Sequence, residues 1–340
     1  KTRKVNMFKT ITKFPYLDGT PQSCDIKLDN GFIKMVLVSL TTQILHWSYK
    51  RKRVTSQTHF PSCQQALFLP GKLKNQVVMV FSSIKMLSEK KGQYRVVADI
   101  NIGTRRLLSV SINDDGSRIF ALDSESAIHV IDTSSFCLLR SITLDGPDFR
   151  YPHARHLLPN SREALFIEET KLSLINLSRG AKETLKYEYD LRNRSAGVSW
   201  ISPSEDRLLF LDGEHRVNIL TLHTKKPQAT KIEIPFTIQD AIWIDENHLL
   251  LKGDTLGQSI FNLSTLKFYR NVKIVKQDPK TSEAKFLFSN KSRILVIYQD
   301  SEITLHEYSM LLSYLFLRHQ GKTILSSLPY FLFKECLFFQ

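Results

Sequence analysis

Four short apolar segments separated by polar turns recur along most of this 340-residue chain, and this recurrence constrains the fold more than any other feature. In residues 107–144 the segments read LLSVSIN, RIFALD, AIHVIDT and FCLLRSITL, with DDGS, SES and SS between them. Each segment is rich in β-branched and other apolar residues, and none reaches helical length. Four consecutive short strands with tight turns are therefore predicted here.

The same order of segments occurs in seven copies, with a period of about 40–45 residues. The copies span residues 23–60, 64–100, 107–144, 154–189, 197–234, 239–274 and 283–309. Four antiparallel strands per copy at this period are typical of a β-propeller, in which each blade packs both faces against its neighbours. A stack of β-sandwiches is the competing all-β fold, but the regular period argues against it. We therefore expect an all-β, seven-bladed propeller of four-stranded antiparallel blades with a short apolar C-terminal extension.

Residues 113–135 (NDDGSRIFALDSESAIHVIDTSS) and 202–222 (SPSEDRLLFLDGEHRVNILTL) share a layout of acidic turn, strand, acidic turn and strand. This layout resembles the WD40-like and YVTN-like propeller superfamily, and the resemblance covers roughly residues 20–309. It implies a seven-bladed ring. The chain departs from strict WD40 repeats because no copy has their Gly-His opening or their closing Trp-Asp pair.

The predicted domain organisation has three parts: an N-terminal strand in residues 1–22, the propeller in 23–309 and a C-terminal strand or helix extension in 310–340. The last copy lacks a clear fourth strand, and a propeller needs one to remove an exposed edge. Either KVNMFKTITKF (4–14) or LLSYLFLRH (311–319) could supply it. The two closures leave different termini free.

The chain is basic, with 47 Lys and Arg against 33 Asp and Glu, a formal charge of +14. Such a balance suits a partner with a negative surface, such as nucleic acid, an acidic protein or anionic lipid. In a propeller, turns between the second and third strands share one face with the blade-to-blade connections, and there the turns are mainly acidic. The turns on the opposite face are mainly basic.

We call these basic turn residues the basic rim. Turns between third and fourth strands contribute Lys50, Arg51, Lys52, Arg53, Lys90, Lys91, Arg95, Arg179, Lys182, Lys225 and Lys226, and a turn between first and second strands adds Lys72 and Lys74. The rim could bind phosphates of a nucleic acid or dock an acidic protein surface. The alternative is that these are ordinary solvated turns.

Motifs for catalysis or cofactor binding are absent: the chain has no phosphate-binding glycine loop, nucleophile elbow, HExxH or EF-hand pattern. We therefore expect a non-enzyme without a cofactor or metal. One histidine-rich crossover, residues 145–158, would line a mouth of the propeller channel, with Arg150, His153, Arg155 and His156 as candidates. The two histidines could form a metal pair or a general base with Asp148, or the segment could be an ordinary loop.

Four widely spaced cysteines, at positions 24, 63, 137 and 336, form no zinc-binding pattern. Reduced, buried cysteines would suit an intracellular protein, cytoplasmic or nuclear, although two disulfides are the alternative. The apolar tail is interrupted by Arg318, His319, Gln320 and Lys322, so neither of its pieces reaches the ~20 residues of a membrane span. Its aromatic residues, Tyr330, Phe331, Phe333, Phe338 and Phe339, are candidates for a partner interface.

Taken together, these features predict a non-catalytic protein–protein interaction scaffold, a subunit of a larger hetero-complex without a transmembrane segment. A nucleic-acid-associated propeller using the basic rim is the first alternative. A propeller enzyme with its site in residues 145–158 is the second.

Overall fold

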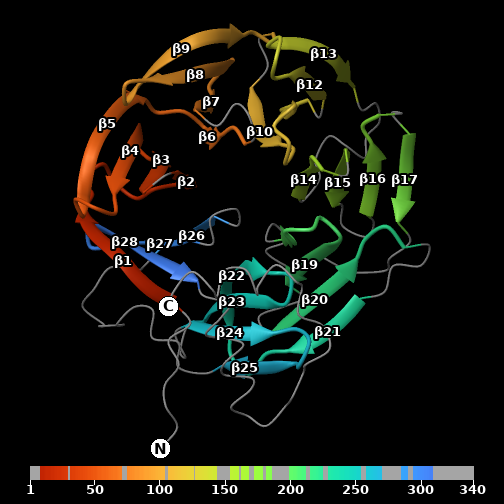
Figure 1. Ribbon diagram of the computed structural model, residues 1–340. Helices are drawn as coiled ribbons and strands as arrows, with labels where there is room; N and C mark the ends of the chain where they lie inside the picture. The colour runs from red at the N-terminus through yellow and green to blue at the C-terminus, as the bar shows by residue number, and fades with distance from the viewer. Residues whose placement is uncertain are drawn as a thin grey trace, which may run out of the picture.

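The computed structural model describes residues 8–308 apart from residues 30, 71–74, 104–105, 126, 144–153, 161, 168–171, 179–180, 186–198, 212–214, 225–228, 254–257, 270–284 and 290–293. Every regular element of the described residues is a β-strand, and the strands form seven four-stranded antiparallel sheets. The sheets are arranged as blades around a ring (Figure 1). The predicted all-β, seven-bladed propeller is confirmed.

Six blades follow the chain in order, each with its first strand innermost and its fourth at the outer edge (Figure 1). Blade one contains β2 (Ser23–Asp29), β3 (Phe32–Val38), β4 (Thr41–Ser48) and β5 (Arg53–Pro61); blade two contains β6 (Gln65–Phe68), β7 (Gln76–Val80), β8 (Ile84–Lys90) and β9 (Gln93–Ile100); blade three contains β10 (Leu107–Ile112), β11 (Arg118–Asp123), β12 (Ile128–Asp132) and β13 (Cys137–Ile142).

The second half of the ring repeats this arrangement. Blade four contains β14 (Ala154–Leu158), β15 (Glu163–Ile167), β16 (Leu172–Asn176) and β17 (Ala181–Leu185); blade five contains β18 (Ser199–Ile201), β19 (Arg207–Leu211), β20 (Arg216–Thr221) and β21 (Ala229–Glu233); blade six contains β22 (Ile238–Asp245), β23 (His248–Gly253), β24 (Gln258–Asn262) and β25 (Lys267–Tyr269). Blade seven contains β26 (Lys285–Ser289), β27 (Ile294–Gln299), β28 (Glu302–Tyr308) and β1 (Phe8–Pro15).

The hydrophobic core lies in the spaces between neighbouring blades. In β3, for example, Val36 packs into a cluster with Met79 of blade two, while Met35 faces the other way into a cluster with Val296 of blade seven. Both faces of the inner strands are thus buried, which explains why runs such as IKMVLVSL are apolar without alternating. We call face A the face of the ring that carries the turns between the first and second strands and between the third and fourth strands of each blade.

Hydrogen bonds on face A join consecutive blades through their first turns. The backbone N–H of Asp114 donates to Asn160 Oδ1 at 2.8 Å, and the N–H of Asn160 donates to Glu205 Oε2 at 3.1 Å. The Ser204 hydroxyl donates to Glu246 Oε2 at 2.8 Å. Blades three to six are therefore linked by polar contacts as well as by apolar packing.

Gly116 occupies the first turn of blade three at a point where the chain approaches blade two. Its φ is 72°, and a β-carbon there would lie 2.7 Å from the carbonyl oxygen of Pro70. Gly31 has a similar φ of 83° but has open space around the same position. A substitution at Gly31 therefore changes the free energy of unfolding through the backbone conformation alone, whereas one at Gly116 adds a steric clash.

Replacing Gly116 by alanine is expected to lower the free energy of unfolding by about 2–4 kcal/mol, because a left-handed φ and a clash with fixed backbone act together. Gly31→Ala is expected to lower it by only about 1 kcal/mol, through the left-handed φ alone. Urea unfolding of the two variants measures the difference. Equal losses would show that blades two and three are not in close contact at Pro70.

Ring closure joins the two ends of the described chain. β1 pairs antiparallel with β28, with Phe8 opposite Tyr308 and Pro15 opposite Glu302. The two strands are the adjacent red and blue arrows in Figure 1. The N-terminal strand thus takes the outer position of blade seven. The alternative closure, in which residues 311–319 take that position, is wrong because β1 occupies it. The remaining predicted boundaries, in residues 1–7 and 310–340, lie outside the described residues.

His306 lies in this closing pair of strands. It is buried, its Nδ1 lies 3.2 Å from Thr10 Oγ1, and its Nε2 has no hydrogen-bond partner among the described residues. Burial, with the nearby charge of Lys13 as a second cause, lowers the pKa of His306 to about 4. The neutral imidazole is thus favoured in the folded state.

Because the folded-state pKa of His306 lies below the unfolded value of about 6.5, the unfolded state binds more protons between these pH values. Stability is therefore expected to fall as the pH drops from about 6.5 to 4, by up to about 3 kcal/mol from this residue. His306→Gln should flatten that decline, whereas His59→Gln, at an exposed position, should not. Urea unfolding across the window tests this, and an unchanged decline in His306→Gln would contradict it.

Candidate interaction surface on blades one and two

Seven residues of the predicted basic rim lie together on face A. Lys50, Arg51, Lys52 and Arg53 fill the turn from β4 to β5 and the start of β5. Lys90, Lys91 and Arg95 lie at the corresponding turn from β8 to β9. All seven residues are exposed to solvent.

The two basic turns are neighbours, although about 40 residues separate them in the chain. The Ser56 hydroxyl of β5 donates a hydrogen bond to the carbonyl oxygen of Gly92 at 2.5 Å. The His46 ring of β4 packs edge-on against the Tyr94 ring of β9, with their centroids 5.7 Å apart. The cations of both turns therefore form one continuous surface across blades one and two.

Three apolar side chains are exposed on blade one at the same face. Leu28 is 47% exposed, Phe32 38% and Tyr49 41%. The Tyr49 N–H donates to the carbonyl oxygen of Gly31 at 3.0 Å, and its ring packs edge-on against buried Trp47 at 5.1 Å between centroids. We name these three residues and the seven cations the basic–apolar surface.

Tyr49 keeps its proton at neutral pH. Partial burial, with the charge of Glu307 as a second cause, raises the pKa of its phenol. The hydroxyl can therefore donate a hydrogen bond to an anionic ligand. Its ring is held by Trp47 and its backbone by Gly31, so ordering it on binding costs little entropy.

A buried ionic cluster lies beneath this surface. Lys34 of β3 places its Nζ 2.8 Å from Asp29 Oδ2 and 2.7 Å from Glu89 Oε2. Burial opposes the charge of Lys34, but two hydrogen bonds and two carboxylate charges outweigh it and raise the pKa. Tyr94 donates to the same carboxylate of Glu89 at 3.3 Å. The two carboxylates of this cluster are thus paired with a buried cation and not with the exposed cations of the surface.

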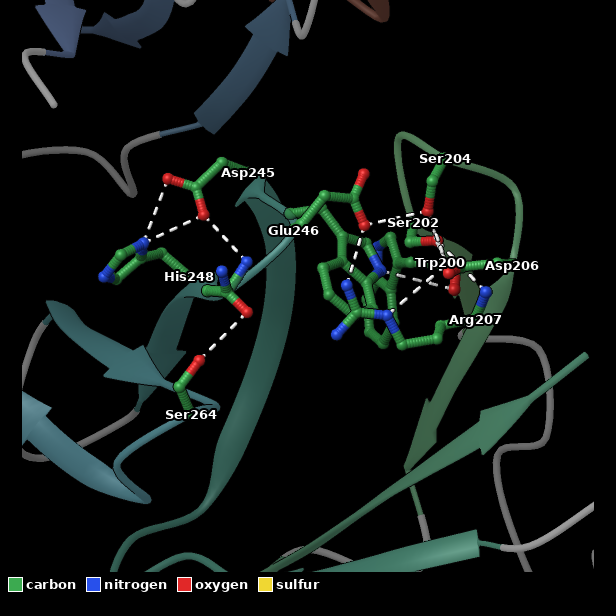
Figure 2. Close-up of polar contacts among 11 residues, drawn as sticks. Trp200, Ser202, Ser204, Asp206, Arg207, Asp245, Glu246, His248 and Ser264 are labelled. Atoms are coloured by element: carbon green, nitrogen blue, oxygen red, sulfur yellow. Dashed lines mark hydrogen bonds and ion pairs between the residues drawn. The ribbon is translucent and has the colours of Figure 1, made fainter. Parts of the chain in front are cut away.

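Blades five and six present a different arrangement on face A (Figure 2). Arg207 Nη2 lies 2.7 Å from Glu246 Oε2, and its Nε lies 3.4 Å from Asp206 Oδ1. The guanidinium also lies over the Trp243 ring, 5.4 Å from its centroid. This arginine is fully engaged within the protein. Among the described residues, by contrast, none of the seven cations of the basic–apolar surface makes an ion pair.

A second polar cluster in Figure 2 is also internally paired. His248 Nδ1 lies 2.9 Å from Asp245 Oδ1, and its Nε2 lies 2.8 Å from Asn262 Nδ2. Burial favours the protonated form of Asp245, but its hydrogen bonds and the charge of His248 outweigh this and lower its pKa. The cluster links the first turn of blade six to β23 and β24 through hydrogen bonds.

Lys52 and Lys91 adopt left-handed backbone conformations, with φ values of 49° and 55°. Glycine takes this conformation without strain, at the expense of greater entropy in the unfolded chain. Lys52→Gly is therefore expected to leave the free energy of unfolding unchanged or to raise it by up to about 1 kcal/mol. Thermal and urea unfolding check this, and a clear loss would contradict it. The variant removes a cation from the surface without loosening the fold.

The other predicted site residues are only partly described. Outside the described residues lie Lys72, Lys74, Arg150, His153, Arg179, Lys225, Lys226, Tyr330, Phe331, Phe333, Phe338 and Phe339. Arg155 belongs to β14 and Lys182 to β17, but the structure describes only the backbone of these two residues. The assignments made to all these residues stay predictions.

His156 is the described member of the histidine-rich crossover. Its Nε2 lies 2.7 Å from Ser199 Oγ of the next blade, and burial lowers its pKa to about 4. It thus connects β14 to β18 as a neutral side chain near pH 7. Within the described residues there is no group of three or more candidate metal ligands, and no helix long and apolar enough to cross a membrane.

Sequence reasoning identified the cations of this surface but missed its apolar members. Tyr49 directly precedes the KRKR run, and Phe32 follows a glycine turn at the start of a strand. Strand alternation places Phe32 on the same face of β3 as Lys34, the one charged residue in the run IKMVLVSL. A charged residue at this position was the available sign that the end of β3 near face A is less apolar than the rest of the strand.

Comparison with known proteins adds no family. No protein-family model matches the chain, and no curated protein is significantly similar to it. The seven-bladed fold is therefore established by the structure, while membership of the WD40-like or YVTN-like superfamily stays a prediction.

Proposed function

We propose that this propeller is a non-catalytic protein-interaction scaffold, a subunit of a larger assembly, which docks a partner protein on its basic–apolar surface. The observation that carries the proposal is a group of seven exposed cations, which make no ion pair with any described residue, beside three exposed apolar side chains on one face of two adjacent blades. Apolar and aromatic anchors supply affinity at protein interfaces, and the surrounding charges steer and orient the partner. Rigid blades keep these groups in a fixed arrangement.

A nucleic-acid-binding propeller is the second candidate, favoured by the same cations. Its affinity would come from phosphate contacts and would fall steeply as salt rises. The rings of Phe32 and Tyr49 suit either candidate, whereas the aliphatic side chain of Leu28 favours a protein partner because it offers no ring on which a base could stack.

Co-purification from cells tests the proposal with two charge-reversal variants of the full chain. K50E/R51E/K90E changes the basic–apolar surface, and R106E/K231E reverses exposed cations elsewhere on the ring. Nuclease treatment separates protein partners from nucleic acid. We expect the first variant to lose specific proteins that the wild type and the control retain. Equal recovery by all three proteins would overturn the proposal, and partners released by nuclease would favour the second candidate.

A further inference from the structure

The basic–apolar surface has apolar groups on both sides of blade one. Leu28 pairs with Ile33, which lies in the cluster shared with blade seven, so Leu28 belongs to that side. Phe32 alternates with Ile33 along β3 and therefore faces blade two. The cations lie in the β4–β5 turn of blade one and in the β8–β9 turn of blade two, on the side of Phe32 and not on the side of Leu28. A ligand covering this surface contacts apolar groups of blade one and cationic groups of both blades.

The charge of the surface selects an anionic ligand. Asp29 and Glu89 are the nearest carboxylates of β2 and β8, and Lys34 pairs with both, at 2.8 and 2.7 Å, so its single charge offsets one of the two. The seven exposed cations therefore outnumber the carboxylate charge beneath them, and the surface keeps an excess of positive charge. An acidic partner would release their counterions and pair with them at the rim of the interface.

Resting on the proposed function, we infer that the partner presents an acidic segment carrying apolar side chains, which lies across blades one and two. Its carboxylates would face the two basic turns, and its apolar side chains would cover Leu28, Phe32 and Tyr49. A phosphate polymer would satisfy the cations but would leave Leu28 uncovered. An acidic amphipathic protein segment satisfies both kinds of group.

Direct titration of the full chain tests this with three probes of equal negative charge. One is a short peptide alternating Asp or Glu with Leu and Phe, one has Ser in place of the apolar residues, and one is a single-stranded oligonucleotide. We expect the first peptide to bind at least about tenfold more tightly than the second, because burial of even one apolar side chain contributes about this factor. The variant F32S/Y49S should remove this difference, while the control L138S/L139S, at similarly exposed apolar positions, should keep it.

Charge variants complete the test. K50E/R51E/K90E should abolish binding of both peptides, and K52G, which keeps the fold, should weaken both to a smaller degree. Equal affinity for the two peptides, no binding of either, or tighter binding of the oligonucleotide near 0.15 M salt would overturn the inference. If co-purification still depends on K50E/R51E/K90E while the peptides fail, the scaffold proposal stands and only the acidic-segment inference falls.

Discussion

Lys34→Met is expected to lower the free energy of unfolding by about 3–5 kcal/mol. The substitution leaves Asp29 and Glu89 partly buried beside each other without the cation that both contact. Two like charges in a poorly solvated site must then be protonated or hydrated, and either requires a change in the packing of blades one and two. Methionine fills a volume similar to the lysine stem, so the loss reports the charge and not a cavity.

The matched control is Lys85→Met, which likewise removes an ion-paired lysine, in this case one on β8 of blade two. Lys85 Nζ lies 3.6 Å from Asp99 Oδ2, and both side chains are exposed. Such pairs contribute at most about 1 kcal/mol. Urea unfolding near pH 7 compares the two variants. Losses of the same size would contradict the buried cluster beneath the basic–apolar surface.

Deleting residues 1–15 is expected to have the largest effect, a loss of at least about 5 kcal/mol together with a tendency to associate. The deletion removes β1, with its pairing to β28 and the buried ring of Phe8, which packs 5.4 Å from the Tyr308 ring. Without β1, the outer edge of β28 is left unpaired and the ring is no longer closed through its first and last strands.

Two point variants in β1 test the same contacts with smaller expected losses of stability. Phe8→Ala, which keeps the strand, is expected to cost about 3–5 kcal/mol, and Lys9→Ala, at the exposed neighbouring position, close to none. Thermal unfolding and light scattering measure stability and association. A deletion that unfolds at the wild-type temperature and stays monomeric would contradict closure by β1.

The blade count and strand order could be predicted from the sequence because each blade is a local unit, set by the pattern of turns and apolar segments. Closure could not be settled in this way. Residues 4–14 and 311–319 are both apolar enough to form the missing strand, and only the long-range pairing of Phe8 with Tyr308 distinguishes them. Nothing local in either segment encodes its distant partner.

The site was predictable in part for a similar reason. The KRKR run shows where cations gather, but whether a cation is free depends on residues far away in the chain. Arg207 is paired with Glu246, 39 positions later, whereas Lys50 to Arg53 meet no such carboxylate among the described residues. The exposure of Phe32 and Tyr49 likewise depends on how two blades meet and not on their own strands.

Lysine acetylation of the native assembly, compared with the isolated chain, tests the proposed interaction surface most directly. Exposed lysines react with acetylating reagents, and a docked partner protects those that it covers. We predict that Lys50, Lys52, Lys90 and Lys91 are protected in the assembly while Lys231, exposed on blade five, reacts equally in both samples. Equal labelling of all five lysines in the two samples would contradict docking on blades one and two.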